Sequence, residues 1–430
     1  MILASARRSL LGLEPFSDRS PKELWYLQSA KRWLEALPIG NGRFGGMIFG
    51  GVDLERMALS ESTAWSGAPR LDDVNPEALP NLAEIRQLLV ADRYSEARKL
   101  CQRFLLAHPT SFGTNLPLPE LLFSFENSGP STAYRRSLDL DQAVARISYR
   151  SNGVLCSREC FASHPDKVIA AHCTCAPGQG VTFRASFANS VIPAKVTSER
   201  NDTLVLRGRA YEKLHSDGSQ GVSLQIRIIV MSEGGQVSST DQALEVRNAR
   251  PATVLIAAAT DYRGGDPDVI CRQQLSQAAQ KRYSQLRTDH IADHQKLYRR
   301  VSLELGTNGN PVAIQPTDVR RRALSAGAND PELVALFSNM AGISLSPDRA
   351  RTYHCHLPCR GFGMMDWQAP WGGLTTSTSI SIHNRITGLL KFATCPSARF
   401  RSLGLSTVSA SPAVVPPSRC TARPAGFATP

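Results

Sequence analysis

The sequence lacks the features that mark membrane, secreted and cofactor-dependent proteins. No apolar run approaches the roughly 18 residues of a membrane helix, so we expect no membrane partner. Arg7 and Arg8 follow only a very short apolar stretch, which reverses the order of a secretory signal. No signal peptide is therefore visible, and the compartment stays unknown.

The ten cysteines have no regular spacing, which argues against a disulfide framework. We expect mostly free thiols in the role of small buried apolar side chains. Cys156 and Cys160, or Cys173 and Cys175, are near enough in sequence to meet in a sheet. A single disulfide in an oxidising compartment therefore stays open.

Acidic residues are fewer than basic ones, and they are fewest in the last part of the chain. The formal charge is +12, but residues 338–430 hold nine Lys/Arg and only two Asp/Glu, so +7 comes from this segment and +5 from the first 337 residues. A nucleic-acid partner requires basic residues patterned on a folded surface. We expect no nucleic-acid partner.

Short strands separated by turn residues dominate the first 265 residues. Apolar and polar residues alternate over 143–149 and 154–161, and Asn152-Gly153 between them is typical of a tight hairpin turn. Further strands are predicted over 46–49, 56–59, 181–187, 203–207, 222–231, 242–246 and 253–258. Many strands with few crossover helices predict a mainly β protein built as a large antiparallel β-sandwich.

Two regions have helical spacing. Leu82, Ile85, Leu88 and Leu89 begin a helical insert with an interruption near Asp92. The pattern turns helical again beyond Asp261 and continues to about Tyr298, where we expect a closing strand. This change predicts a domain edge followed by a helical linker.

One glycine motif resembles a nucleotide-binding fingerprint in spacing alone. Gly40, Gly42 and Gly45 fit the G-x-G-x-x-G pattern, but the flanking residues do not predict the strand and helix that a Rossmann site requires. We interpret the segment as a tight turn between strands, and we expect no cofactor.

Histidine and cysteine clusters give no convincing metal or catalytic site. His354, Cys355, His356 and Cys359 are zinc-ligand types, but their spacing is too crowded to converge on one tetrahedral ion. His294 follows Asp293 directly, so the two point to different helix faces, and a surface or interdomain histidine is the favoured interpretation. We therefore name no catalytic, cofactor-binding or metal residue.

Several segments together resemble a known family. They are LWYLQSAKRWLEALPIGNGRFGGMIFGGV, LSESTAWSG, LPLPELLFSF, YRRSLDLDQAVARISYRSNG, ECFASHPDKVI and DHQKLYRRVSLELG. In this order they resemble family 95 glycoside hydrolases, the α-L-fucosidases, over Leu24 to Phe337. The resemblance implies an N-terminal β-sandwich, a helical linker and an (α/α)6 barrel that carries the chemistry. It also implies inverting hydrolysis of a fucosylated oligosaccharide or glycan by a Glu general acid and an Asp acting with an N-x-N pair.

After Phe337 the sequence no longer has the residue patterns of a folded protein. Shifting the codon frame lets residues 339–345 be read as Q-Y-G-R-Y-L-L and residues 385–398 as N-Y-W-P-A-E-I-C-N-L-P-E-C, which resemble barrel-opening motifs of the family. Residues 338–430 are rich in Ser, Pro, Ala and Arg, a composition that does not support folding. We hypothesise that the frame slips near Phe337.

These observations predict four parts. They are an N-terminal extension (1–22), the β-sandwich (23–265), a helical linker with the start of the barrel (266–337) and an out-of-frame, disordered tail (338–430). The chain is expected to carry the non-catalytic front of an α-L-fucosidase and to be inactive. The alternative is a stand-alone carbohydrate-binding β-sandwich.

Overall fold

The computed structural model describes residues 22–67, 75–106, 113–126, 129–213, 221–305 and 315–345, with backbone alone for 341–345. All of these residues belong to one compact unit, Met1–Leu374. The sequence predictions for residues 1–21, and for 346–430 with the His354 to Cys359 cluster, lie outside the described residues.

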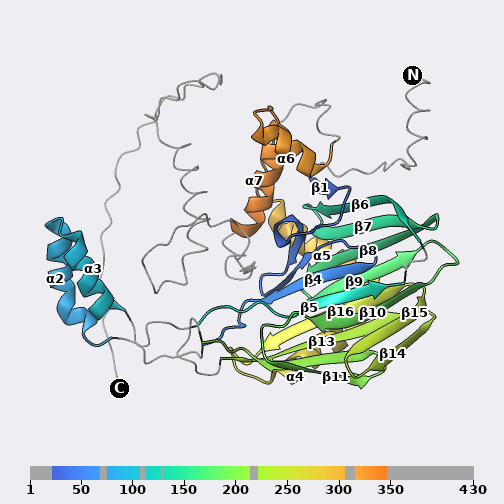
Figure 1. Ribbon diagram of the computed structural model, residues 1–430, viewed down its shortest axis with the longest axis horizontal. Coiled ribbons are helices and arrows are strands. Elements are labelled where there is room, and N and C mark those ends of the chain that lie inside the picture. The colour runs from blue at the N-terminus through green and yellow to red at the C-terminus, as the bar shows by residue number, and fades with distance from the viewer. Residues whose placement is uncertain are drawn as a thin grey trace, which may run out of the picture. The chain divides into compact units, whose positions relative to one another are not determined.

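Two antiparallel sheets form the body of this unit (Figure 1). The larger sheet has nine strands in the order β1 (Glu23–Tyr26), β6 (Ser131–Asp139), β7 (Val144–Ser151), β8 (Val154–Ser163), β9 (Val168–Cys175), β16 (Ala252–Thr260), β13 (Ser223–Ser232), β12 (Thr203–Arg209) and β11 (Ala194–Arg200). The smaller sheet has seven in the order β14 (Gln236–Thr240), β15 (Ala243–Ala249), β10 (Val181–Ala188), β5 (Glu120–Phe125), β4 (Leu54–Glu61), β3 (Phe44–Ile48) and β2 (Leu37–Gly40). The predicted mainly β, antiparallel fold class is confirmed.

The hairpin predicted around Asn152-Gly153 forms as expected. Asn152 and Gly153 both have positive φ, at 47° and 78°, and Ser151 of β7 pairs with Val154 of β8. This backbone geometry suits an Asn-Gly pair because both residues tolerate the left-handed region.

Strand β16 is buried on both faces, which explains its continuous apolar sequence. Val254 and Ile256 belong to the core cluster that contains side chains of both sheets. Leu255 and Ala257 belong to a second cluster with Leu275 of helix α4 (Pro267–Ala279). Helix α4 therefore covers the outer face of the larger sheet at its centre.

The helical insert is the predicted helix pair. It consists of α2 (Ala78–Val90), α3 (Tyr94–Leu100) and one π-helical turn, η2 (Cys101–Leu105). Asp92 lies between α2 and α3 with a φ of 57°, so the predicted interruption is where the chain reverses.

The helical linker is also present, with two differences from prediction. After α4 come α5 (Tyr283–Tyr298), α6 (Thr317–Ser325) and α7 (Pro331–Leu345). No strand follows Tyr298 within the described residues; instead the Asn339 side chain bonds the backbone of Leu303, accepting from its N–H at 2.9 Å and donating to its carbonyl at 2.9 Å. Disorder from Ser338 onward is also wrong for residues 338–345, because they continue α7.

The structure pairs two cysteines differently from either expected pair. Cys156 and Cys175 lie opposite one another on β8 and β9, with Cα atoms 4.0 Å apart, and form a disulfide. Each pair considered from the sequence lies along a single strand, whereas sheet register places Cys156 beside Cys175. The other described cysteines are free thiols, as predicted: Cys101, Cys160, Cys173 and Cys271.

Candidate functional site

His294, which the sequence analysis considered as a catalytic candidate, has a structural role. His294 is 2% exposed, so a surface position is wrong, and its Nε2 lies 2.8 Å from the carbonyl oxygen of Leu140. It packs between α5 and the sandwich, as an interdomain residue would. Asp293 instead lies 3.8 Å from Nδ1 of His164, so the two neighbours face different partners and do not form an acid–base pair.

The glycine motif forms a strand–turn–strand unit, as predicted. Asn41 and Gly42 connect β2 to β3, and Asn41 Oδ1 accepts hydrogen bonds from the backbone N–H of Arg43 at 3.2 Å and of Phe44 at 2.9 Å. Gly42 has a φ of 92°, which glycine adopts without strain. No helix begins here, so the Rossmann alternative is excluded by the fold.

A cleft of about 560 Å³ opens beside this turn. Its walls come from the β2–β3 turn, the end of β4 and the loop after it, the loop between β8 and β9, the end of β16 and the side of α4. Figure 1 shows β4, β16 and α4, three of the elements that border this cleft. The volume lies in the range of small-molecule sites.

Helix α4 is placed against the cleft by its own sequence. Asp266 caps the helix by accepting a 2.8 Å hydrogen bond from the N–H of Asp268, and Pro267 occupies the first turn. Cys271, Gln274 and Leu275 then form a buried stripe at helical spacing. Gln274 is the polar member of this stripe and lines the cleft.

Buried polar groups form the cleft floor. Glu61 is 1% exposed and accepts hydrogen bonds from the backbone N–H and the hydroxyl of Thr63, both at 2.6 Å. Arg43 Nη1 donates to Glu61 at 3.2 Å and to the carbonyl of Ala258 at 2.8 Å. The Thr63 hydroxyl is also hydrogen-bonded to that of Thr260. This network fixes the side chains before any ligand arrives.

Two buried atoms of the floor have no hydrogen-bond partner. They are Nη2 of Arg43, a donor, and Oε1 of Gln274, an acceptor. Gln274 is only 8% exposed, so water from the bulk does not surround its side chain. A buried polar atom without a partner costs about 1–3 kcal/mol, which a bound ligand can offset.

The cleft rim is aromatic and cationic. Trp65 is half-buried and fixed by a 3.0 Å hydrogen bond from Nε1 to the Ser62 carbonyl, while Tyr262 is 46% exposed. Lys167 and Arg263 are exposed and take part in no ion pair or hydrogen bond with the described residues. The rim therefore offers aromatic surface together with positive charge.

The arrangement suits binding better than acid–base catalysis. Glu61 is the only carboxylate among the described residues that line the cleft. Glycoside hydrolysis by two carboxylates needs a second such group. Among the described residues, no group of His, Cys, Asp and Glu could hold a metal ion.

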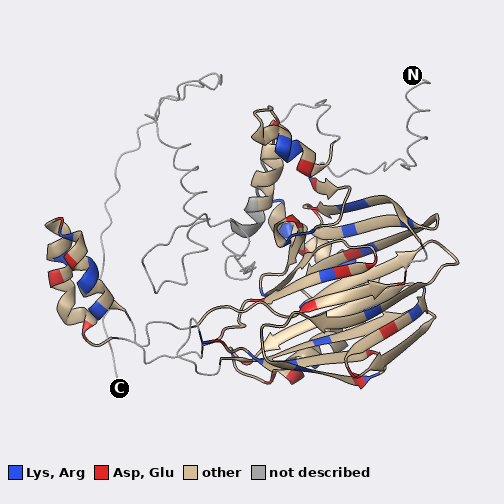
Figure 2. Cartoon of the chain, in the orientation of Figure 1, with Lys and Arg blue, Asp and Glu red and all other residues tan. Residues whose placement is uncertain are grey.

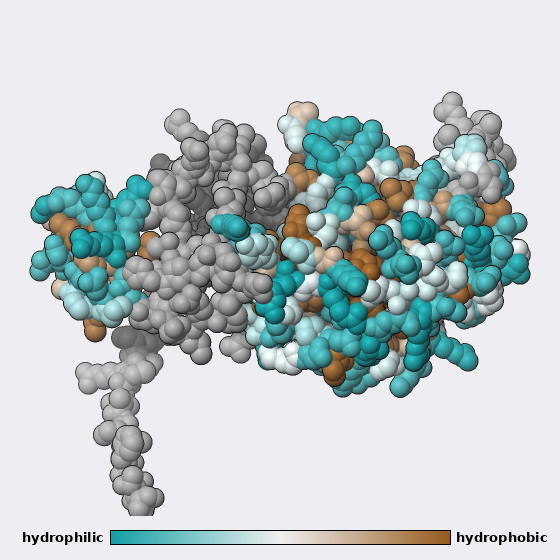
Figure 3. All heavy atoms as spheres, turned by 60° about the horizontal axis from the view of Figure 1, so that its bottom comes forward, coloured by the Kyte–Doolittle hydropathy of each residue, from teal (hydrophilic) through white to brown (hydrophobic). Residues whose placement is uncertain are grey.

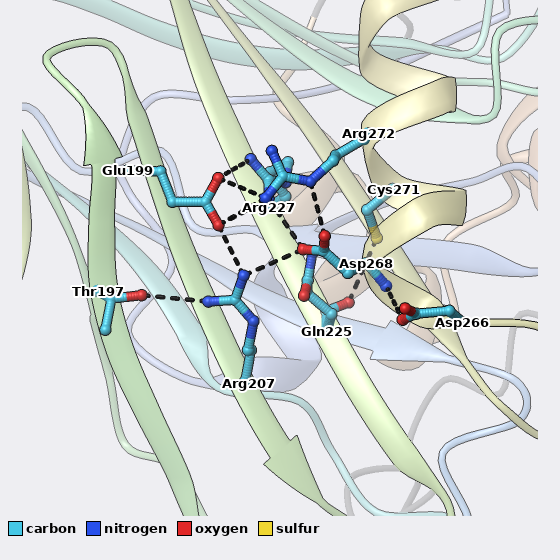
Figure 4. Close-up of polar contacts among 9 residues, drawn as sticks. All are labelled: Thr197, Glu199, Arg207, Gln225, Arg227, Asp266, Asp268, Cys271 and Arg272. Atoms are coloured by element: carbon cyan, nitrogen blue, oxygen red, sulfur yellow. Dashed lines mark hydrogen bonds and ion pairs between the residues drawn. The ribbon is translucent and has the colours of Figure 1, made fainter.

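A second polar cluster, drawn in Figure 4, fastens α4 to the sheet edge. Glu199 of β11 accepts from Arg227 of β13 at 2.8 and 2.9 Å and from Arg207 of β12 at 2.6 Å. Asp268 of α4 accepts from Arg227 at 2.9 Å and from Arg272 at 2.6 Å. We call these five residues the arginine clamp. Both of its carboxylates are paired with arginines of the clamp, so we interpret it as a structural cluster.

The clamp lowers the pKa of its acids. Burial alone would raise the pKa of Glu199, but hydrogen bonds from Arg227 and Arg207 outweigh burial and lower this pKa to about 2. Burial also opposes ionisation of Asp268, and the hydrogen bonds from Arg272 and Arg227 nevertheless hold its pKa well below the usual range.

Sequence reasoning named no cleft residue as functional. Arg43 stands inside the glycine motif, and Glu61, Thr63 and Trp65 lie in LSESTAWSG, which contributed only to a family resemblance. Gln274 is one of three glutamines in α4 and has no spacing signal of its own. The convergence of these separate segments becomes visible only in the fold.

Two family profiles match the chain. Residues 24–265 match the profile described as "Glycosyl hydrolase family 65, N-terminal domain". Residues 282–373 match the "Glycosyl hydrolase family 95 catalytic domain". The first range contains both sheets, and the second begins at the start of α5.

Curated relatives agree with these profiles. The chain is 32% identical to "Alpha-L-fucosidase 2" of Arabidopsis thaliana over 86% of the chain and 47% of that protein. It is 25% identical to "Probable alpha-fucosidase A" of Aspergillus niger, over 66% of the chain and 37% of that protein, and 24% identical to the Aspergillus oryzae protein of the same name, over 69% and 43%. The chain thus spans less than half the length of each of these relatives.

Proposed function

The chain belongs to the glycoside hydrolases that join a family 65-type N-terminal domain to a family 95 catalytic domain, and from this we propose that its gene derives from an α-L-fucosidase gene. The complete enzyme would remove terminal α-L-fucosyl groups from glycans with inversion. The described residues would supply its non-catalytic sandwich and linker. We propose that the chain as it stands has no fucosidase activity.

One observation carries the proposal of inactivity. The family resemblance requires a Glu general acid in the barrel, but residues 338–430 contain only two acidic residues, Asp348 and Asp366, and no glutamate. The described cleft has Glu61 as its one carboxylate and lacks the second that hydrolysis needs. Residues 338–430 therefore supply no glutamate for the role of general acid.

The position of the frame slip is part of the proposal. The catalytic-domain match runs to residue 373, past Phe337, so the profile still detects similarity in this frame beyond the expected slip. Helix α7 also continues to Leu345. The coding DNA decides between a slip near codon 337, a later slip and no slip at all.

The test combines sequencing with an assay. We expect the DNA after codon 337 to encode the barrel-opening motifs in a shifted frame, and the purified chain to release no fucose from a 2'-fucosylated oligosaccharide. A frame-restored version, carried alongside as the control, should release fucose with inverted anomeric configuration in an NMR time course. Fucose release by the unrestored chain, or absence of the shifted motifs from the DNA, would refute the proposal.

A second function, glycan binding by the sandwich itself, is favoured by the cleft. Its fixed floor, unpaired buried atoms and aromatic rim are typical features of a small-molecule site. The basic charge does not favour nucleic acid, because Lys/Arg and Asp/Glu are interspersed over the sandwich strands (Figure 2). Binding of fucosylated glycans by the unrestored chain, without hydrolysis, would support this function.

A further inference from the structure

We propose that the cleft between the β2–β3 turn and α4 binds a sugar that carries a carboxylate, a hexuronic acid unit of an acidic glycan. The inference extends the proposed glycan-binding function to a chemical class of ligand. It does not depend on whether the chain or its parent gene has fucosidase activity.

The charge of the lining favours an anion. Arg43, Lys167 and Arg263 are cationic, and Glu61 is the one acidic residue among the described lining residues. Glu61 is already engaged by Arg43 and Thr63, so it neutralises neither Lys167 nor Arg263. An anionic group in the cleft would face Lys167 and Arg263 at the rim, which no described residue pairs, and on the floor Nη2 of Arg43, which has no partner among the described residues.

The geometry of arginine favours a carboxylate. Nη1 of Arg43 is held by Glu61 and the Ala258 carbonyl, which fixes the guanidinium plane and leaves Nη2 unpartnered. Hydrogen bonds between a guanidinium and a carboxylate are charge-assisted and about twice as strong as neutral ones. Because the plane is fixed in advance, little side-chain entropy is lost when such a bond forms.

The remaining features favour a sugar over a simple anion. Gln274 Oε1 is an unpartnered acceptor, which a free inorganic anion cannot satisfy but a sugar hydroxyl can. Trp65 and Tyr262 offer aromatic surface at the rim for the C–H face of a sugar ring. A hexuronic acid combines the three required elements: carboxylate, hydroxyl donors and an apolar ring face.

The surface of the molecule is consistent with a polar ligand. On the face drawn in Figure 3, hydrophobic side chains of the sandwich are scattered among hydrophilic ones. The described lining likewise mixes polar side chains with a few apolar ones such as Ile270.

The experiment compares ligands that differ in one group. Methyl β-D-glucuronide and methyl β-D-glucoside are titrated into the full chain by calorimetry, with saturation-transfer NMR to show which ligand protons contact the protein. We expect the glucuronide to bind at least tenfold more tightly than the glucoside. Raising the salt concentration should weaken glucuronide binding, because the rim cations are exposed and screened.

Variants locate the binding in the cleft. The double variant Lys167→Gln/Arg263→Gln should lose about tenfold in glucuronide affinity, since each exposed charge contributes modestly. A matched control, Arg184→Gln/Lys195→Gln, removes the same charge from exposed positions on β10 and β11 and should bind as the unmodified chain does. Gln274→Leu tests the floor, and it should weaken glucuronide without changing the affinity for acetate.

Three outcomes would overturn the inference. Equal affinity for glucuronide and glucoside would show that no carboxylate is recognised. Equal losses in the cleft and control variants would place binding elsewhere. Competition by acetate at the same concentration as glucuronide would reduce the cleft to an adventitious anion site. None of these outcomes bears on fucosidase activity, which the DNA sequence and the fucose assay test separately.

Discussion

The guanidinium of Arg158 lies inside the sandwich and joins its two sheets. Arg158 of β8 is 4% exposed in its side chain, and its Nη2 lies 3.2 Å from Oε2 of Glu55 on β4, which is 2% exposed. Glu55 Oε1 accepts from the backbone N–H of Gly50 at 2.8 Å. Burial raises the pKa of Glu55, while the charge of Arg158 opposes that rise. The pair is therefore a buried charge pair in which each partner depends on the other.

Removing Arg158 alone should be strongly destabilising. We expect Arg158→Met to cost about 3–5 kcal/mol in the free energy of unfolding, because it leaves the Glu55 carboxylate buried and unpaired. The pKa of Glu55, raised by burial, should rise further in this variant. The variant should therefore be more stable near pH 5 than near pH 8, since stability from a raised carboxyl pKa is lost as pH rises through it.

Urea unfolding at the two pH values measures this effect. Arg93→Met, which removes an arginine whose side chain is 56% exposed and paired with Glu96, is the control and should change stability little. The double variant Arg158→Met/Glu55→Met should recover much of the loss. Equal costs for the two single arginine variants would contradict the buried-pair account.

At the scale of elements, the arginine clamp determines how firmly α4 is held. The folded-state pKa of Glu199 is about 2, and that of Asp268 is also lowered, both below their unfolded values. The stabilisation is therefore present above the unfolded pKa values near 4 and is lost as pH falls towards 2. Glu199→Gln/Asp268→Asn should cost about 2 kcal/mol at pH 7 and clearly less near pH 2, where the folded-state carboxylates begin to be protonated.

Circular dichroism melts across pH 2 to 7 check this prediction. The acid-induced loss of stability should be shallower in the double variant than in the unmodified chain. Glu96→Gln, on an exposed helix pair, should leave the slope unchanged. Parallel pH curves for the clamp variant and the unmodified chain would show that the clamp contributes nothing.

A second prediction concerns the disulfide that joins β8 to β9. Cys156 and Cys175 close a loop across a sequence separation of 19 residues. Cys156→Ser/Cys175→Ser should lower unfolding stability by about 3 kcal/mol, chiefly by freeing the unfolded chain. Reduction of the unmodified chain should produce the same loss, whereas Cys101→Ser should produce none. A reducing agent without effect on denaturant midpoints would argue against the bond.

Elements with strong local patterns could be predicted from the sequence, and weaker ones could not. The Asn152-Gly153 hairpin and the apolar strand β16 have clear signals of turn chemistry and burial. Edge strand β11, with the sequence AKVTSER, has no buried residue, so no apolar alternation marked it. The cleft could not be predicted because Arg43, Thr63 and Gln274 meet only through sheet register and the docking of α4.

At the scale of the whole molecule, the described residues form a complete sandwich with a helical linker. Among the helices of the described part, none is long and apolar enough to cross a membrane. Expectation and structure differ most near Phe337, where α7 continues and Asn339 is 8% exposed and bonded to Leu303. The composition of residues 338–345 predicted disorder, but these residues extend α7. The buried side chains of Leu333 and Leu336 already fix the start of that helix against the core.

Strand β16 has a consequence for biosynthesis. It pairs with β9 on one side and β13 on the other, and its β9 partner Cys173 precedes Ala252 by 79 residues, about a third of the 243-residue sandwich. Until the ribosome has released residues up to Thr260, the larger sheet consists of two halves with open edges, one made of β1 and β6 to β9 and the other of β11 to β13. Such edges invite pairing with other chains. The nascent protein should therefore need chaperone protection until this late strand arrives.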